Sequence, residues 1–265
     1  MGAAIAAAVA RVRIASPPGG LIRTNVAGAA VPAVLGDGLV AGSLVALAVL
    51  AGAAALGWTA ADSGRTGAAV ALAIGILGAA GRLDDLRGDE DIRGFSGHLR
   101  AAARGRVTGG ALKIFAGGVA GLATGALVAS GLDILVVGLL VALGANTFNL
   151  LDRAPGRAGK LWLLAALPLF VWGSSGWGVG AAGMAGALIA VLPADLGARG
   201  MLGDAGANPL GAVWGLGLAS ATGDVGRAVA IGVLVLVNAA SEKWSFSHAI
   251  ESVRWLRSLD HLGRK

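Results

Sequence analysis

The sequence predicts an all-α protein, a polytopic transmembrane helix bundle of about eight spans with a polar cleft that faces the cytosol. Three observations lead to this prediction. Apolar residues make up 56% of the 265 residues and charged residues only 14%, which is far from the composition of a soluble globular protein. A bilayer crossing needs about 20 apolar residues, so the chain has room for about eight spans joined by short loops. Basic residues also gather in alternate loops, which predicts the orientation of the spans.

Eight apolar runs are separated by short polar segments. The ambiguous stretch covers residues 161–193 and carries Ser174, Ser175 and Gly176 near its middle. Two short spans in this stretch preserve the alternation of sides, whereas one long span would break it. The predicted spans are residues 38–57, 66–81, 110–129, 132–150, 161–174, 176–193, 206–222 and 226–240.

The basic residues lie almost entirely on one predicted side of the membrane. That side holds 19 of the 21 Lys and Arg residues, and the other holds only Arg65 and Arg227. Cytosolic loops carry such an excess, so we expect a multi-pass protein of the plasma membrane. The net charge of +6 is spread over loops without interleaved aromatic residues, so we expect membrane lipids and no nucleic acid as partners. The predicted cytosolic segments are residues 11–37, 82–113, 151–160, 194–205 and 241–265.

We expect a single integral membrane domain over residues 1–265, because no internal repeat is evident. The 46 glycines favour close helix packing and permit a homodimer without requiring one. Residues 1–10 are either a truncated first span or a segment that lies on the surface. Residues 241–265 are expected to form an interfacial amphipathic helix, with apolar side chains on one face and arginines near the headgroups. Those residues are Ile250, Val253, Leu256, Leu259, Arg254, Arg257 and Arg264.

Cysteine is absent, so disulfides, Cys-ligated metals and thiol chemistry are excluded. The first candidate for chemistry is the pair Asp84 and Asp85, which directly follows an apolar span. Adjacent carboxylates near a membrane repel each other and are costly to desolvate unless a cation compensates them. One interpretation is a solvated loop beside Arg82 and Arg87. The other is a divalent cation bound by hard oxygen ligands.

Asn149 and Asp152 lie three residues apart at the cytosolic end of a predicted span. Side chains at this spacing project from one helix face, so they can bind a ligand together or simply cap the helix end. Asn146 lies one turn deeper and needs a polar partner inside the lipid.

Asp204 lies between two glycines, Gly203 and Gly206, just ahead of an apolar span. Asp at this point is a good N-cap. The glycines also allow a phosphate to approach the backbone, and a helix N-terminus favours anions. The two roles are compatible.

The topology derived from basic residues alone places these acidic and amide side chains on the same membrane face. The segment RTNVAGAAVPAVLGDG, with Arg23 and Asn25, shares that face. Lys113, at the start of another span, either reaches a phosphate or extends its ammonium to the headgroups. The sequence therefore predicts a cytosolic cleft suited to a metal ion and phosphates.

Four segments, in this order, resemble the polyprenyl-phosphate N-acetylhexosamine-1-phosphate transferase family. The family includes phospho-N-acetylmuramoyl-pentapeptide transferase and the transferases that start surface glycans. The matching patterns are RTN…G…VP…LGDG, LDD, NxxNLxD and GDAG. They extend from Arg23 to Gly206.

The resemblance implies a Mg²⁺-dependent membrane enzyme. It would move a sugar-1-phosphate from a UDP-sugar to polyprenyl phosphate, undecaprenyl or decaprenyl, with release of UMP, in cell-envelope glycan synthesis. By motif match, Asp84 and Asp85 are the catalytic acidic pair, and Asp85 and Asp204 hold the magnesium ion. The expected substrate-binding residues are Asn149, Asp152, Asn25, Lys113 and Arg23.

Two departures from the family pattern leave alternatives open. Pro155 stands where the family commonly has a second Asp, and only His248 and His261 lie in the tail that corresponds to a histidine-rich motif. A non-catalytic relative that binds polyprenyl phosphate or nucleotide as a scaffold or regulator is the main alternative. A transporter would need ionisable residues at the centres of its spans, and almost none occur there.

Overall fold

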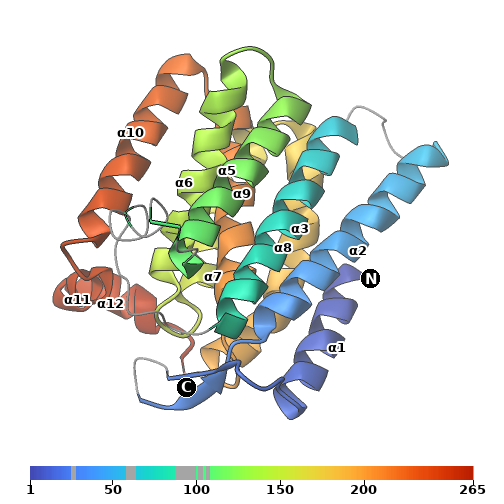
Figure 1. The fold of residues 1–265 in the computed structure, drawn as a ribbon. Helices are drawn as coiled ribbons and strands as arrows, with labels where there is room; N and C mark the ends of the chain where they lie inside the picture. The colour runs from blue at the N-terminus through green and yellow to red at the C-terminus, as the bar shows by residue number, and fades with distance from the viewer. Residues whose placement is uncertain (25–27, 58–63, 88–99, 101–103, 106–107, 265) are drawn as a thin grey trace.

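The computed structural model describes residues 1–24, 28–57, 64–87, 100, 104–105 and 108–264 (Figure 1). These residues form eleven helices and one two-stranded sheet, so the all-α prediction is confirmed. The strands are β1 Ile22–Thr24 and β2 Ala30–Pro32. The helices are α1 Gly2–Ala15, α2 Leu35–Ala55, α3 Gly64–Arg87, α5 Gly109–Val128, α6 Asp133–Leu151, α7 Arg157–Trp172, α8 Ser175–Leu196, α9 Asp204–Ala221, α10 Asp224–Ser241, α11 Phe246–Ser252 and α12 Arg254–His261.

Each predicted span corresponds to a helix, but the predicted number of spans was too high. Within the described residues, six helices are long and apolar enough to cross a membrane, namely α2, α3, α5, α6, α8 and α10. The chain is therefore a membrane-embedded helical bundle. Helix α7 has 16 residues, about 24 Å, which is shorter than the ~30 Å hydrocarbon layer. Helix α9 carries Asp204, Asn208 and Pro209 in its first two turns, which lowers its hydrophobicity.

Helix α9 is the central helix of the bundle. Most of its residues are buried, and it packs against α2, α3, α6 and α7. Gly211 of α9 lies so close to Gly144 of α6 that a Cβ on Gly211 would collide with the Gly144 carbonyl. This contact is the close packing through small residues that the glycine content predicted.

Two buried tryptophans fix the surrounding helices to α9. Trp162 of α7 donates its indole N–H to the carbonyl oxygen of Leu210 at 2.8 Å. Trp177 of α8 donates its indole N–H to the carbonyl oxygen of Val213 at 2.7 Å. Both indoles are fully buried, so each polar N–H has the partner that burial requires.

Helix α10 packs mainly on α6 and exposes apolar side chains, including Val229, Val233 and Leu236. Such an exposed apolar face fits contact with lipid tails. The predicted polar partner of Asn146 is on this helix, because the Asn146 amide donates to the Asn238 side-chain oxygen. Asn146 is exposed on the surface of the bundle, and the expectation that its side chain has a polar partner is confirmed.

One end of the bundle carries the β1–β2 hairpin, the ends of α3, α6 and α8 and the beginnings of α5, α7 and α9 (Figure 1). The hairpin was not predicted. It is tied to the segment before α9 by the Met201 N–H, which donates to the Pro32 carbonyl oxygen at 3.0 Å. Asp84 and Asp85 lie in the last turn of α3, whereas the sequence placed them in a loop.

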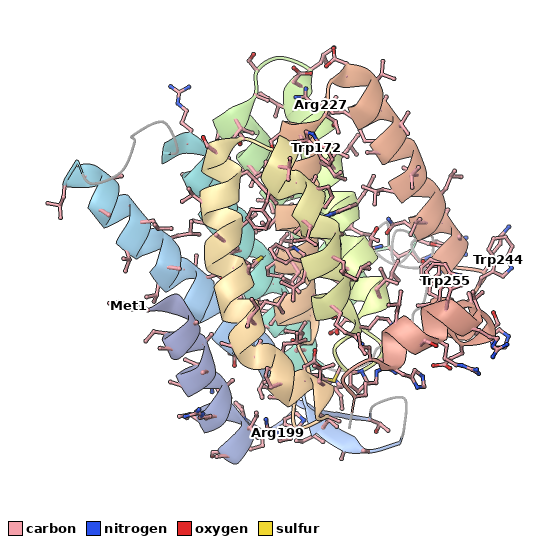
Figure 2. All side chains as sticks on the ribbon, turned by 180° about the vertical axis from the view of Figure 1, so that it is seen from behind. Met1, Trp172, Arg199, Arg227, Trp244 and Trp255 are labelled. Atoms are coloured by element: carbon pink, nitrogen blue, oxygen red, sulfur yellow. The ribbon has the colours of Figure 1, made fainter. Side chains whose placement is uncertain are left out.

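The segment 241–265 contains two short helices, α11 and α12, in place of the single helix expected from the sequence. The break is at Val253, whose backbone is extended. Trp244 and Trp255 point away from the bundle (Figure 2) and are 70% and 63% exposed. Exposed indoles suit a membrane interface, and the interfacial location stays a prediction.

Candidate functional site

Asp85 connects the end of α3 to the beginning of α9. Its carboxylate accepts hydrogen bonds from the backbone N–H groups of Asp204 and Ala205, each at 3.1 Å. These are among the N–H groups that a helix N-terminus leaves without intrahelical partners. The residue before the helix is Gly203, with φ of +63°, and a Cβ there would lie 2.9 Å from Asp85 Oδ2. Glycine is required at this position both by the backbone conformation and by the space that Asp85 occupies.

Lys113 lies between two carboxylates from different helices. Its ammonium is 2.8 Å from Asp84 Oδ2 and also pairs with Asp204. The side-chain amide of Asn149 donates to the other oxygen of Asp204. Four of the predicted site residues thus form one connected cluster drawn from α3, α5, α6 and α9.

Arg23 forms another wall of the site. Its guanidinium donates to the Asp85 carbonyl oxygen, and to the carbonyl oxygens of Gly20 and Ile22 at 2.9 Å each. The bond to Asp85 ties the hairpin to the end of α3. The predicted substrate-binding residue Asn25 lies outside the described residues.

Asp152 ends α6 and points into the same site as Asp195, which is near the end of α8. Burial raises the pKa of Asp152 well above its usual range, and the negative charge of Asp195 raises it further. Oδ2 of each carboxylate is shielded from solvent and has no hydrogen-bond partner among the described residues. These two oxygens are therefore free to bind a ligand.

These side chains line a cavity of about 350 Å³. All the predicted site residues that the structure describes contribute to it. Its lining carries five carboxylates and three basic side chains, so an added cation would reduce the local negative charge. The charged lining residues are Asp84, Asp85, Asp152, Asp195, Asp204, Arg23, Lys113 and Arg153.

A magnesium ion fits the residues around Lys113. The Lys113 ammonium is a positive charge held between Asp84 and Asp204, which is the position that a cation bound by both would take. Asp85 is less suited to bind the ion, because its two oxygens accept the N–H groups that begin α9. The geometry therefore favours Asp84 and Asp204 as the metal ligands.

Asp195 lines the cavity and was missed by sequence reasoning, whereas Arg82, which the sequence placed beside the acidic pair, lies outside the cavity lining. Arg82 donates from Nε to Asp37 Oδ1 at 2.8 Å, and its Nη1 lies 3.6 Å from Asp85 Oδ2. Asp195 has the same sequence signature as the predicted site residues, a carboxylate at the predicted cytosolic end of an apolar run. That signal could have found it.

Pro155, which replaces an expected acidic residue, lines the cavity and is bound to the C-terminal segment. Arg264 donates from Nε to the Pro155 carbonyl oxygen at 3.0 Å. His261 is exposed and pairs with Glu251 at 2.8 Å, and neither His248 nor His261 lines the cavity. Both histidines are exposed side chains of the C-terminal segment.

Comparison with known proteins adds no assignment to this geometry. No model of a known protein family matches the sequence, and no curated protein matches it.

Proposed function

We propose that the protein is a Mg²⁺-dependent membrane phosphoglycosyltransferase. It moves a sugar-1-phosphate, such as N-acetylhexosamine-1-phosphate, from a UDP-sugar to polyprenyl phosphate and releases UMP. The proposal places the site at the cytosolic face of the plasma membrane and the reaction in cell-envelope glycan synthesis. The sequence resemblance supplies the reaction class.

One observation supports the proposal most strongly. Residues from motifs that are more than a hundred positions apart meet at a single cavity at one end of a membrane-embedded bundle. A site at the end of apolar helices can receive a lipid phosphate from the bilayer and a water-soluble nucleotide from the other side. Asp84, Asn149 and Asp204 are joined there by direct contacts and through Lys113.

The transfer is a displacement at phosphorus. An oxygen of polyprenyl phosphate attacks the β-phosphorus of the UDP-sugar, a new P–O bond forms, and the bond to UMP breaks with its electron pair leaving on UMP. Negative charge accumulates on the phosphate oxygens during this step, so cationic groups stabilise it. Magnesium, when bound, supplies the largest part of that positive charge.

The residues of the chain divide this work. Asp84 and Asp204 would hold the metal ion, and Lys113, which lies between them, would bind a phosphate oxygen of the substrate. Asn149 orients Asp204 through its hydrogen bond. Asp152 and Arg23 line the space for the substrates.

The test uses the purified full-length protein with MgCl₂, undecaprenyl phosphate and a panel of UDP-sugars, and it measures UMP release. Asp84→Asn should reduce the rate at least about tenfold, which corresponds to ~1.4 kcal/mol of transition-state stabilisation. The matched control is Asp224→Asn. Asp224 is 96% exposed at the opposite end of the bundle, so this change should leave the rate unaltered.

Two results would contradict the proposal. If the unmodified protein releases no nucleotide with any donor but binds polyprenyl phosphate, the protein is a non-catalytic scaffold or regulator. If Asp84→Asn and Asp224→Asn release UMP at the same rate, the acidic pair does not take part in the transfer.

A further inference from the structure

Asp152 and Asp195 share a feature that no other pair of carboxylates in the cavity has. Oδ2 of each is shielded from solvent and has no hydrogen-bond partner in the described part of the chain. Asp195 as a whole is only 2% exposed. A buried carboxylate oxygen without a partner is costly, so these two atoms call for a positively charged or donating ligand.

The basic side chains nearest to Asp195 do not provide that partner. Lys160 and Arg264 attract Asp195 electrostatically, but both are engaged elsewhere. Lys160 donates to three backbone carbonyls of the C-terminal segment, at 2.6, 2.8 and 3.1 Å. Arg264 pairs with Asp260 at 2.6 Å and donates to Pro155. Oδ2 of Asp195 therefore remains available to bind a cation.

We propose that Asp152 and Asp195 form a second divalent-cation site in the cavity, separate from the position held by Lys113 between Asp84 and Asp204. Small divalent cations such as Mg²⁺ prefer carboxylate oxygens and are commonly bound by one or two carboxylates together with water and phosphate oxygens. Asp152 directly follows α6, Asp195 lies in the last turn of α8, and both line the cavity. Burial strengthens the electrostatic repulsion between the two carboxylates, and a bound cation offsets it. This site depends only on the cavity and does not require the transfer reaction.

The test counts bound Mn²⁺, a paramagnetic substitute for Mg²⁺, on the purified full-length protein. Electron paramagnetic resonance of free Mn²⁺ gives the number of ions bound per chain at each concentration. We expect two ions on the unmodified protein and on Asp224→Asn, the control for binding to an exposed carboxylate. Asp195→Asn should lose one ion, and Asp204→Asn should lose the other. Asp152→Asn removes the same site from a different helix and replaces Asp195→Asn if that variant does not fold.

The alternative occupant of the pair is a shared proton. In that case the unmodified protein binds one ion, Asp195→Asn and Asp152→Asn bind as many as Asp224→Asn, and the proposal is overturned. The outcome is independent of the proposed function. Two bound ions without UMP release would support the second cation site and contradict the transferase. One bound ion with UMP release would contradict the second cation site and support the transferase.

Discussion

The ion pair between Arg157 and Asp260 holds the C-terminal segment against the bundle, and its removal tests how that segment is anchored. Arg157 Nε and Nη2 each lie 2.8 Å from one oxygen of the Asp260 carboxylate. The two side chains are only 7% and 4% exposed. We choose Arg157→Met, which keeps much of the length of the side chain and removes its charge.

The expected cost follows from this geometry. Removing one partner of a buried ion pair typically destabilises a protein by about 3–5 kcal/mol. Arg264 still pairs with Asp260 at 2.6 Å in the variant, so we expect a value near the lower end, about 3 kcal/mol. Because α12 is joined to the bundle mainly through Asp260 and Lys160, the loss should appear as release of this helix and not as unfolding of the bundle.

Hydrogen–deuterium exchange of residues 254–261 measures that release directly. About 3 kcal/mol corresponds to an increase in exchange rate of roughly 10²-fold, if exchange follows the open population. Arg254→Met is the matched control. It makes the same substitution at an exposed arginine of α12, the helix whose exchange is measured. If exchange in Arg157→Met stays within about threefold of that control, the ion pair does not anchor the segment and the reasoning is refuted.

Two further predictions concern the same end of the bundle. Burial alone would raise the pKa of Asp260, but the Arg157 and Arg264 guanidinia outweigh it and lower the pKa below its usual range. The stabilisation is therefore present above the unfolded pKa of about 3.9 and is lost as pH falls through the lower folded pKa. Exchange of α12, corrected for its intrinsic rate, should rise only below about pH 4, and Asp260→Asn should abolish this step. For topology, single cysteines at Ser16 and Ser258 should react with an impermeant thiol reagent from the cytosolic side and one at Ser130 from the other. Labelling of Ser130 and Ser258 from the same side would contradict the orientation.

The sequence was sufficient to predict the helices, because hydrophobicity over about twenty residues is a local property. It also placed the acidic and amide residues at one end, because the basic residues indicate which loops share a side. The partner of Asn146 could be expected for a similar reason, since an amide inside lipid needs a hydrogen bond. What the sequence could not indicate was which residue of another helix, Asn238, supplies it.

The remaining features depend on contacts between distant segments. The three-residue strands of the hairpin are too short to show an alternating pattern, and the hydrogen bond between Pro32 and Met201 holds them in place. The central position of α9 follows from glycine contacts with other helices, which hydropathy does not report. The position of Lys113 between Asp84 and Asp204 likewise requires three helices to meet.

The acidic pair itself shows how neighbouring residues of one motif acquire different roles. Successive side chains of a helix point about 100° apart, so Asp84 and Asp85 make different contacts. Asp85 is directed at the beginning of α9, where two backbone N–H groups occupy its oxygens and fix the position of Asp204. Asp84 instead pairs through its side chain with the Lys113 ammonium at 2.8 Å. We therefore infer that Asp85 is a positioning residue, and that Asp84 is the member of the pair that exchanges its partner for a metal ion or a phosphate-bound cation.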